Sequence, residues 1–149
     1  MNNEGNQKML ADFAHKCHGV NLRVTPQRVA VYQELVKSKA HPSANMVYQK
    51  VRKKFPHISL DTVNRTLLTL AEVGLASVLA GSGDGKRFDG GLETHQHFRC
   101  IKCNKIIDFN CRGLENIKLP AAIRENFTIL AKTVYLEGIC SYCKKRNRD

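Results

Sequence analysis

Several features are missing from this chain of 149 residues. It contains no tryptophan, and aromatic residues make up only 7% of it. No apolar run approaches the roughly 18–20 residues that a membrane-spanning helix requires. The N-terminus lacks the apolar segment of a secretory signal peptide. We therefore expect a soluble, cytoplasmic protein without a membrane partner.

Motifs of the common enzyme classes are missing as well. No Ser–His–Asp or Cys–His pattern occurs in a recognisable nucleophile context. Gly81, Gly83 and Gly85 superficially resemble a phosphate-binding loop. That segment joins two short predicted strands and opens no helix, so neither a P-loop nor a dinucleotide-binding fold is predicted. The sequence favours a protein that is not an enzyme.

Basic residues outnumber acidic ones by 24 to 13, which gives a net charge of +11. A hydrophobic content of 42% with 25% charged residues is typical of a folded domain rather than of a disordered basic tail. A positive excess of this size indicates a polyanionic partner, and nucleic acid is the first candidate. The excess is +6 over residues 1–89 and +5 over residues 90–149, so composition alone marks neither half as the binding domain.

The first 75 residues have the periodicity of helices. Apolar spacing predicts a helix over residues 6–17. Three further helices are predicted to begin at Thr25-Pro26, at Ser43 and at Ser59, because each position offers an N-cap hydroxyl. Pro56 is expected to end the third helix, and Gly74 the fourth.

Strands are predicted after Gly74. Residues 75–80 and 87–89 are expected to pair across a turn at residues 81–86. Helices followed by a hairpin indicate a winged helix-turn-helix domain over residues 1–89. Residues 90–149 are predicted to form a second domain with strands at 95–101, 105–110 and 127–136 and a helix at 114–125. The predicted fold class is therefore α+β, with a DNA-binding domain followed by an α/β dimerisation and metal-binding domain.

Four cysteines form two matched pairs, Cys100-x-x-Cys103 and Cys140-x-x-Cys143. Each pair spans a tight turn that can present two sulfurs to one ion, and four thiolates suit a structural Zn²⁺. Buried core cysteines or disulfides are the alternative, but two matched pairs in a reducing compartment favour metal. Cys17 and Cys111 have no such partner and are predicted to be packing residues.

A second group of possible metal ligands contains nitrogen and oxygen but no sulfur. His95 and His97 are two apart on a predicted strand, so their imidazoles share a face. Asp89 and Asp108 are the acidic candidates nearby, and His41 offers a further nitrogen. Such a donor set fits Fe²⁺ or Mn²⁺. From spacing alone the alternative, a surface histidine pair, remains open.

The fourth predicted helix offers a polar outer face that includes Thr62, Asn64 and Arg65. Asn and Arg read adenine and guanine edges in the major groove. An ordinary solvated helix face is the alternative, and the preceding helix and following hairpin favour DNA.

Taken together, these motifs resemble the ferric uptake regulator family, and most closely its peroxide-sensing repressors. The resemblance covers about residues 7–143. It rests on Thr25-Pro-Gln-Arg28, His41-Pro-Ser, Thr62-Val-Asn-Arg-Thr-Leu-Leu-Thr-Leu, Arg87-Phe-Asp89 and His95-x-His97-x-x-Cys100-x-x-Cys103 with Ile107-Asp108-Phe109. It implies a homodimer and a palindromic DNA operator.

The resemblance also implies roles for the metal-ligating residues. The four paired cysteines would hold structural Zn²⁺. A regulatory Fe²⁺ or Mn²⁺ would be bound by His41, Asp89, His95, His97 and Asp108. Peroxide would act on bound iron and oxidise a ligand histidine, His41 or His95, and so release the DNA.

The sequence departs from the family pattern at several positions. Asn64 stands where the family usually has Tyr, so the resemblance leaves the operator sequence open. Asp108 matches the peroxide sensors, whereas iron-uptake regulators more often have Glu there. The flanking positions Thr94 and Gln96, together with Lys132, lack the ligands of a third metal site, which we do not expect.

Other functions stay open from the sequence. An iron- or zinc-responsive uptake repressor of the same family is the main alternative. A non-haem iron enzyme is less favoured, because five protein ligands leave little room for a substrate. An RNA-binding zinc ribbon would need clustered aromatic residues for base stacking, and none cluster here.

Overall fold

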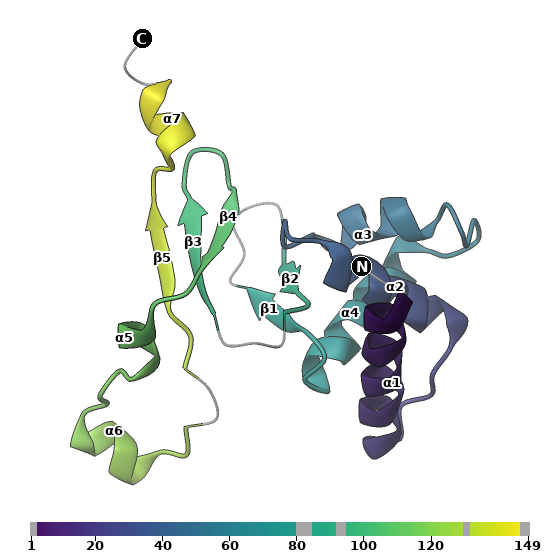
Figure 1. The fold of residues 1–149 in the computed structure, drawn as a ribbon, viewed down its shortest axis with the longest axis horizontal. Helices are drawn as coiled ribbons and strands as arrows, with labels where there is room; N and C mark the ends of the chain where they lie inside the picture. Colours follow the sequence, from purple (N-terminus) through teal and green to yellow (C-terminus); the bar gives the residue numbers. More distant parts are fainter. Residues whose placement is uncertain (1–2, 80–84, 92–94, 130–131, 147–149) are drawn as a thin grey trace. The chain divides into compact units, whose positions relative to one another are not determined.

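The computed structural model describes residues 3–79, 85–91, 95–129 and 132–146, which fold as an α+β protein (Figure 1). Contacts divide the chain into two compact units, Met1–Leu92 and Glu93–Asp149. The division lies three residues after the boundary at residue 89 that the sequence suggests. Each unit has its own secondary structure.

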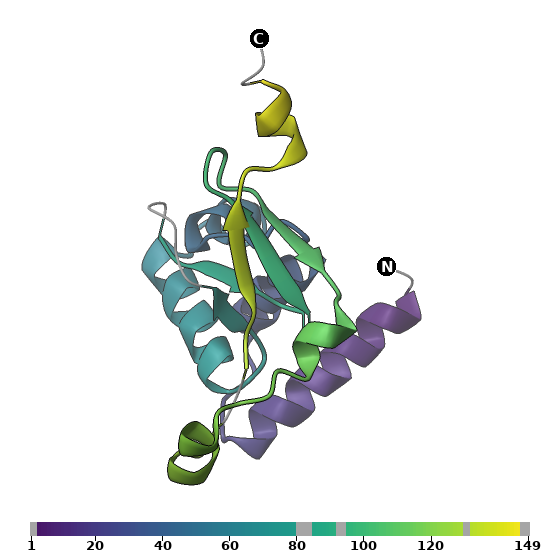
Figure 2. The ribbon, with the colours of Figure 1, turned by 90° about the vertical axis from the view of Figure 1, so that its left-hand side faces the viewer.

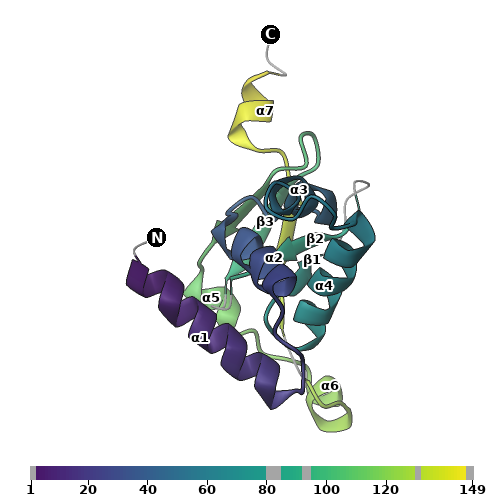
Figure 3. The ribbon, with the colours of Figure 1, turned by 90° about the vertical axis from the view of Figure 1, so that its right-hand side faces the viewer.

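The first unit consists of four helices and a hairpin (Figure 3). The hairpin pairs two short antiparallel strands, with Val78 opposite Phe88. The elements are α1 (Asn3–Gly19), α2 (Pro26–Lys37), α3 (Ala44–Val51), α4 (Leu60–Glu72), β1 (Ser77–Leu79) and β2 (Arg87–Asp89). This order matches the winged helix predicted from the sequence. The predicted turn at residues 81–86 lies largely outside the described residues.

Side-chain caps fix where three of the helices begin. The Thr25 hydroxyl accepts a hydrogen bond from the Arg28 N–H at 3.3 Å. Ser43 accepts from the Met46 N–H at 3.3 Å, and Ser59 accepts from the Thr62 N–H at 3.0 Å. Each bond satisfies an N–H that the first helical turn would leave unpaired. The three predicted helix starts are confirmed.

Of the two predicted helix ends, the one at Gly74 is confirmed and the one at Pro56 is wrong. Gly74 closes α4 at a positive φ of 72°, and the Leu75 N–H donates to the Leu70 carbonyl at 2.8 Å, as in a Schellman motif. The predicted end of the third helix at Pro56 is wrong, because α3 ends at Val51. The N–H groups of residues 54 and 55 both donate to the Val51 carbonyl, so the helix changes into a turn before the proline is reached.

One hydrophobic core fills the first unit. Leu35, Leu67 and Phe88 are fully buried and come from α2, α4 and β2. The helix α1 joins this core through Phe13, whose ring stacks on Tyr32 with 4.7 Å between the centroids. Cys17, also on α1, is fully buried, which confirms its predicted packing role.

The second unit is built on a three-stranded sheet in the order β4-β3-β5 (Figure 2). The central strand β3 (Gln96–Cys100) pairs antiparallel with β4 (Ile106–Phe109) and parallel with β5 (Tyr135–Gly138). Three short helices complete the unit: α5 (Arg112–Glu115), α6 (Ala121–Asn126) and α7 (Ser141–Lys145). In Figure 2 the yellow β5 lies beside β3 and leads into α7.

Three predictions for the second unit are wrong. The helix predicted over residues 114–125 is two short helices, α5 and α6. Pro120 becomes the residue before α6, since it has no N–H to continue a helix. The strand predicted over residues 127–136 begins only at Tyr135 in the described part. Cys111 is exposed and is not a packing residue.

Among the helices that the structure describes, none has the length and apolar composition needed to cross a lipid bilayer.

Candidate metal and nucleic-acid sites

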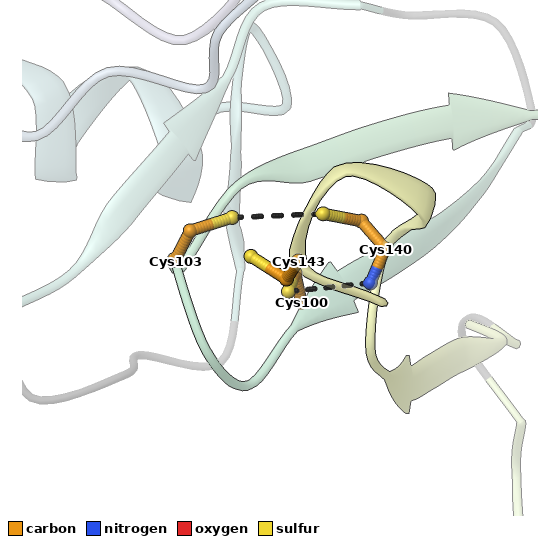
Figure 4. Close-up of side chains that lie close together, drawn as sticks. All are labelled: Cys100, Cys103, Cys140 and Cys143. Carbon is orange, nitrogen blue, oxygen red and sulfur yellow. Dashed lines mark hydrogen bonds between the residues drawn. The ribbon is translucent and has the colours of Figure 1, made fainter. Parts of the chain in front are cut away.

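The four paired cysteines lie together at one end of the sheet (Figure 4). Cys100 ends β3 and Cys103 lies in the turn that follows, while Cys140 directly precedes α7 and Cys143 belongs to that helix. All four sulfurs lie within 4.8 Å of one another. The Ile101 N–H donates to the Gly138 carbonyl at 2.8 Å, which ties the first turn to the strand that leads to the second.

The geometry of this cluster fits a tetrahedral metal ion. Four sulfurs at about 2.3 Å from a zinc ion are separated from each other by about 3.8 Å. The Sγ atoms of Cys103 and Cys140 are 3.8 Å apart. The residues present therefore match a four-thiolate zinc site in number, chemistry and spacing.

The pKa values of two thiols in the cluster are shifted in opposite directions. The Cys140 N–H donates to the Cys100 sulfur at 3.3 Å, and this hydrogen bond is the main reason that the pKa of Cys100 is lowered to about 6. Burial, followed by hydrogen bonding with Cys103, raises the pKa of Cys143 to about 12. One thiolate thus forms readily near neutral pH, whereas another needs a positive ion beside it.

In the first unit, His41 and Asp89 form a buried pair, with 3.9 Å between Nε2 and Oδ1. His41 has a left-handed backbone with φ of 48°, which is unusual for a residue other than glycine. The strand β2 holds it there: the Arg87 guanidinium donates to the carbonyls of Ala40 and His41, and the Phe88 N–H donates to the Pro42 carbonyl. The motif Arg87-Phe-Asp89 therefore positions His41 as well as supplying Asp89.

Asp89 itself is fixed by the two glycines that follow. Its Oδ1 accepts a hydrogen bond from the Gly91 N–H at 2.8 Å. A Cβ at Gly90 would lie 3.2 Å from the Val36 Cα, which is too close for most side-chain contacts. Gly90 thus lets the chain leave β2 close to α2 without a shift of Leu35 or Val36.

In the second unit, His95, His97 and Asp108 converge. The Nε2 atoms of His95 and His97 lie 3.8 and 3.6 Å from the same Asp108 oxygen. His97 and Asp108 face each other across β3 and β4, and the two imidazole centroids are 4.6 Å apart. The imidazoles share a face, as strand alternation predicts. Nitrogen and oxygen atoms at this spacing can bind one ion as neighbouring ligands.

Sequence reasoning missed Tyr135 beside this group. Tyr135 pairs with His97 across β3 and β5, and their ring centroids are 6.3 Å apart. It also missed the role of Gln96, which is buried and accepts a hydrogen bond from the Cys111 N–H at 2.7 Å. Only the strand register could have indicated these neighbours, and that register is not encoded in local motifs.

The outer face of α4 carries the predicted DNA-binding residues. Arg65 is 73% exposed and lies 2.7 Å from the Asp61 carboxylate, one helical turn earlier. Asn64 is half-buried. Thr62 contributes to the N-cap, because its hydroxyl is 2.8 Å from that of Ser59. Arg65 is therefore the most accessible of the three.

A polar pocket of about 500 Å³ adjoins this face of α4. No acidic residue lines it, so it has the chemistry of an anion site. Its lining residues are Arg23, Thr25, Gln27, Arg28, Thr62, Arg65, Thr66 and Thr69. Arg23 was not singled out from the sequence, and Arg28 was noted there only as part of the Thr25-Pro-Gln-Arg28 motif.

With both ligand groups placed, comparison with known proteins identifies the family. The sequence model of the ferric uptake regulator family matches residues 19–137. The chain belongs to the ferric uptake regulator family. The resemblance found in the sequence is thereby confirmed.

Individual relatives are similar over most of the chain. The peroxide operon regulator of Bacillus subtilis (strain 168) is 36% identical over 125 residues, which cover 84% of this chain and 86% of that protein. The peroxide stress regulator of Campylobacter jejuni is 27% identical with a TM-score of 0.67, covering 96% of this chain and all of the other.

A third relative is the ferric uptake regulator of Helicobacter pylori, whose structure is described as having three functional metal-binding sites. It is 25% identical, with a TM-score of 0.75, and 93% of each chain is covered. Members of this family are metal-responsive transcription repressors, which bind DNA as dimers and are not enzymes. The expectation of a regulator rather than an enzyme is confirmed.

The contacts of Arg87 generate a prediction for the first unit. Lysine cannot reproduce the guanidinium hydrogen bonds to the two carbonyls at residues 40 and 41, so Arg87→Lys should lower the free energy of unfolding by about 1–3 kcal/mol. Urea unfolding measures this change. Arg124→Lys, at an exposed position of α6, is the control and should leave stability unchanged. Equal stability of the two variants would contradict the proposed role of Arg87.

Proposed function

We propose that this protein is a metal-dependent repressor that senses hydrogen peroxide and binds a palindromic operator as a homodimer. Residues 1–89 would bind DNA, and residues 90–149 would provide dimerisation and most of the metal ligands. The observation that carries the proposal is that one group of candidate ligands, in the second unit, contains only sulfur, whereas a further group in each unit contains only nitrogen and oxygen.

The sulfur set is assigned to a structural Zn²⁺ held by Cys100, Cys103, Cys140 and Cys143. Zinc has no redox chemistry and prefers four tetrahedral thiolates. The cluster joins the end of β3 to α7, which are 40 residues apart in the sequence. Binding of zinc there would contribute directly to the folding of the second unit.

The nitrogen and oxygen set is assigned to a regulatory ion. His41 and Asp89 come from the first unit, whereas His95, His97 and Asp108 come from the second. Imidazole and carboxylate ligands suit Fe²⁺ and Mn²⁺. An ion that takes ligands from both units binds one arrangement of the units better than others, so it shifts the population toward that arrangement. Metal-dependent DNA binding would follow.

Recognition of the operator is assigned to α4. Asn64 and Arg65 would contact base edges, while Thr62 and the polar pocket beside the helix would contact the backbone. A two-fold dimer places its two recognition helices about one DNA turn apart, which favours a palindromic site. To contact a guanine, Arg65 must exchange its ion pair with Asp61 for the base.

Peroxide sensing is supported by the names of the relatives and by the chemistry of the ligands. The regulatory set contains no thiol, so an imidazole is the group that peroxide can modify there. A bound Fe²⁺ ion would supply the electron that reduces peroxide. In the net reaction, one oxygen atom of peroxide would enter the imidazole ring of His41 or His95 in place of a carbon-bound hydrogen, the other oxygen would leave as water, and the modified ring would lose its affinity for metal. In the proposed regulatory set, His41 is the histidine that comes from the first unit. Its oxidation would therefore leave Asp89 as the remaining ligand from that unit.

Loss of the zinc site should disrupt the second unit. We expect Cys140→Ser to contain less than one zinc ion per chain and to dimerise poorly. Metal analysis of the purified protein and analytical ultracentrifugation measure the two effects. Cys111→Ser removes an exposed thiol outside the cluster and should change neither. A zinc-free but stable dimer of Cys140→Ser would contradict the structural role.

Loss of Arg65 should reduce specificity more than general attraction to DNA. An operator can be selected from a random duplex library with the manganese-loaded protein. Arg65→Ala should then bind it about 1–3 kcal/mol more weakly, with a smaller effect on scrambled duplex. Arg124→Ala is the control with the same change of charge in the second unit. Equal losses on both duplexes would exclude base recognition by Arg65.

Peroxide should modify the iron-loaded protein only. After anaerobic loading with Fe²⁺ and brief exposure to peroxide, the peptide containing His41 or His95 should gain one oxygen atom, and operator affinity should fall. Mn²⁺-loaded protein should bind the operator and resist oxidation, because Mn²⁺ gives up an electron less readily. Asp108→Glu should retain metal-dependent binding but show less oxidation.

Peptide mass spectrometry and fluorescence anisotropy give the two readouts. If neither peptide gains oxygen while operator binding still follows the iron or zinc concentration, the protein is a metal-uptake repressor instead. That is the alternative function within the same family.

A further inference from the structure

A second basic surface lies between α3 and α4, away from the residues discussed so far. Between Glu34 and Asp61 the sequence contains six Lys or Arg residues and no Asp or Glu. Five basic side chains gather at the end of α3 and in the turn that follows, and we call them the α3–α4 basic patch. They are Lys50, Arg52, Lys53, Lys54 and His57, and all are exposed.

The backbone under this patch is fixed. The Arg52 N–H donates to the Tyr48 carbonyl at 2.9 Å, and the Lys54 N–H donates to the Val51 carbonyl at 3.0 Å. Val51 and Ile58 are buried on either side of the exposed residues. The turn is therefore anchored to the core by apolar side chains, while its charged side chains face solvent.

The lysine and arginine charges of the patch have no acidic partner among the residues that the structure describes. Within the part of the chain that the structure describes, ion pairs are found for Lys37 and for Arg65, with Glu34 and Asp61, but for no member of the patch. The Arg52 guanidinium instead lies 5.4 Å from the centre of the Tyr48 ring. That cation–π contact orients Arg52 and leaves its charge available.

The position of the patch indicates its partner. It ends two residues before Ser59, the N-cap of α4, whose first turn carries the proposed base-reading residues. In helix-turn-helix proteins the recognition helix enters the major groove with its N-terminal residues, and the preceding helix crosses the DNA backbone. Because the patch joins these two helices, the same arrangement would bring it near the phosphates that flank the groove.

We propose that the α3–α4 basic patch binds the phosphates of duplex DNA beside the bases that α4 reads. This inference rests on the proposed function as a DNA-binding repressor. Contacts to phosphates fix orientation and raise affinity but carry no sequence information. The patch would thus strengthen binding to operator and to unrelated duplex alike, in contrast to Arg65.

The test compares Lys53→Ala/Lys54→Ala with two control variants. Lys53→Arg/Lys54→Arg keeps both charges, and Lys144→Ala/Lys145→Ala removes two charges from α7 in the second unit. Binding of the manganese-loaded protein to the selected operator and to a scrambled duplex of equal length is measured by anisotropy over a series of salt concentrations. Thermal unfolding checks that each variant is folded.

We expect the alanine variant to bind both duplexes several-fold more weakly at low salt. A plot of log affinity against log salt concentration has a negative slope, and each phosphate contact contributes about 0.9 to its magnitude. Loss of two contacts should therefore make the slope shallower by about 1.8. The arginine variant should behave like the wild type, and the α7 variant should keep most of the slope.

An unchanged slope for the alanine variant, or a loss equal to that of the α7 variant, would overturn the proposal. A preference for RNA would also overturn the proposal. In that case the wild-type protein would bind single-stranded RNA more tightly than scrambled duplex, and the alanine variant would lose that preference. Failure of the proposed function is a separate result: the wild type would then select no sequence and show no dependence on metal.

Discussion

The hydrogen-bonded register of β3 is the constraint on which both ligand groups of the second unit depend. This strand is paired on both sides, with β4 and with β5. The same five residues end in Cys100 and place His97 opposite Asp108. A slip of one residue would turn His97 away from Asp108 and move Cys100 away from Cys140 at the same time. One strand register thus sets the positions of residues in both groups.

The strand β3 carries side chains of two different candidate metal sites, His97 and Cys100, only three residues apart. Thiolates at its end suit an ion that does not change oxidation state, whereas imidazoles and a carboxylate near its start suit an ion that can. Because Cys100 and His97 differ by an odd number of positions, their side chains leave the strand on opposite faces. In the proposed function, this separation keeps the structural thiolates away from the group that reacts with peroxide.

Much of this arrangement could be predicted from local sequence. Ser59 and Gly74 mark the ends of α4 through capping, which depends on neighbouring residues alone. The cysteine pairs and the His-x-His spacing likewise act within a few residues. Cys111 was wrongly assigned to the core, because exposure depends on contacts between distant segments and not on residue type.

Other details depend on tertiary structure and could not be predicted. The left-handed backbone of His41 is imposed by hydrogen bonds from Arg87, 46 residues later. The polar pocket beside α4 forms because the loop before α2 packs near that helix, which brings Arg23 close to Arg65. The helix α3 ends early, and the turn that follows it is held by hydrogen bonds to the Val51 carbonyl and by the buried side chains of Val51 and Ile58. Helix propensity alone does not predict these contacts.

The hydrogen bonds between β2 and the His41 loop have a mechanical consequence. Arg87 holds the backbone at His41, Phe88 is buried in the core, and Asp89 lies beside the His41 imidazole. The last strand of the hairpin and the first-unit ligands are thus parts of one stiff body. Either side chain is thus joined to the hairpin by adjacent covalent bonds or by hydrogen bonds from Arg87 and Phe88. In the proposed function, an ion bound by His41 and Asp89 would therefore meet side chains whose backbone is already held by β2.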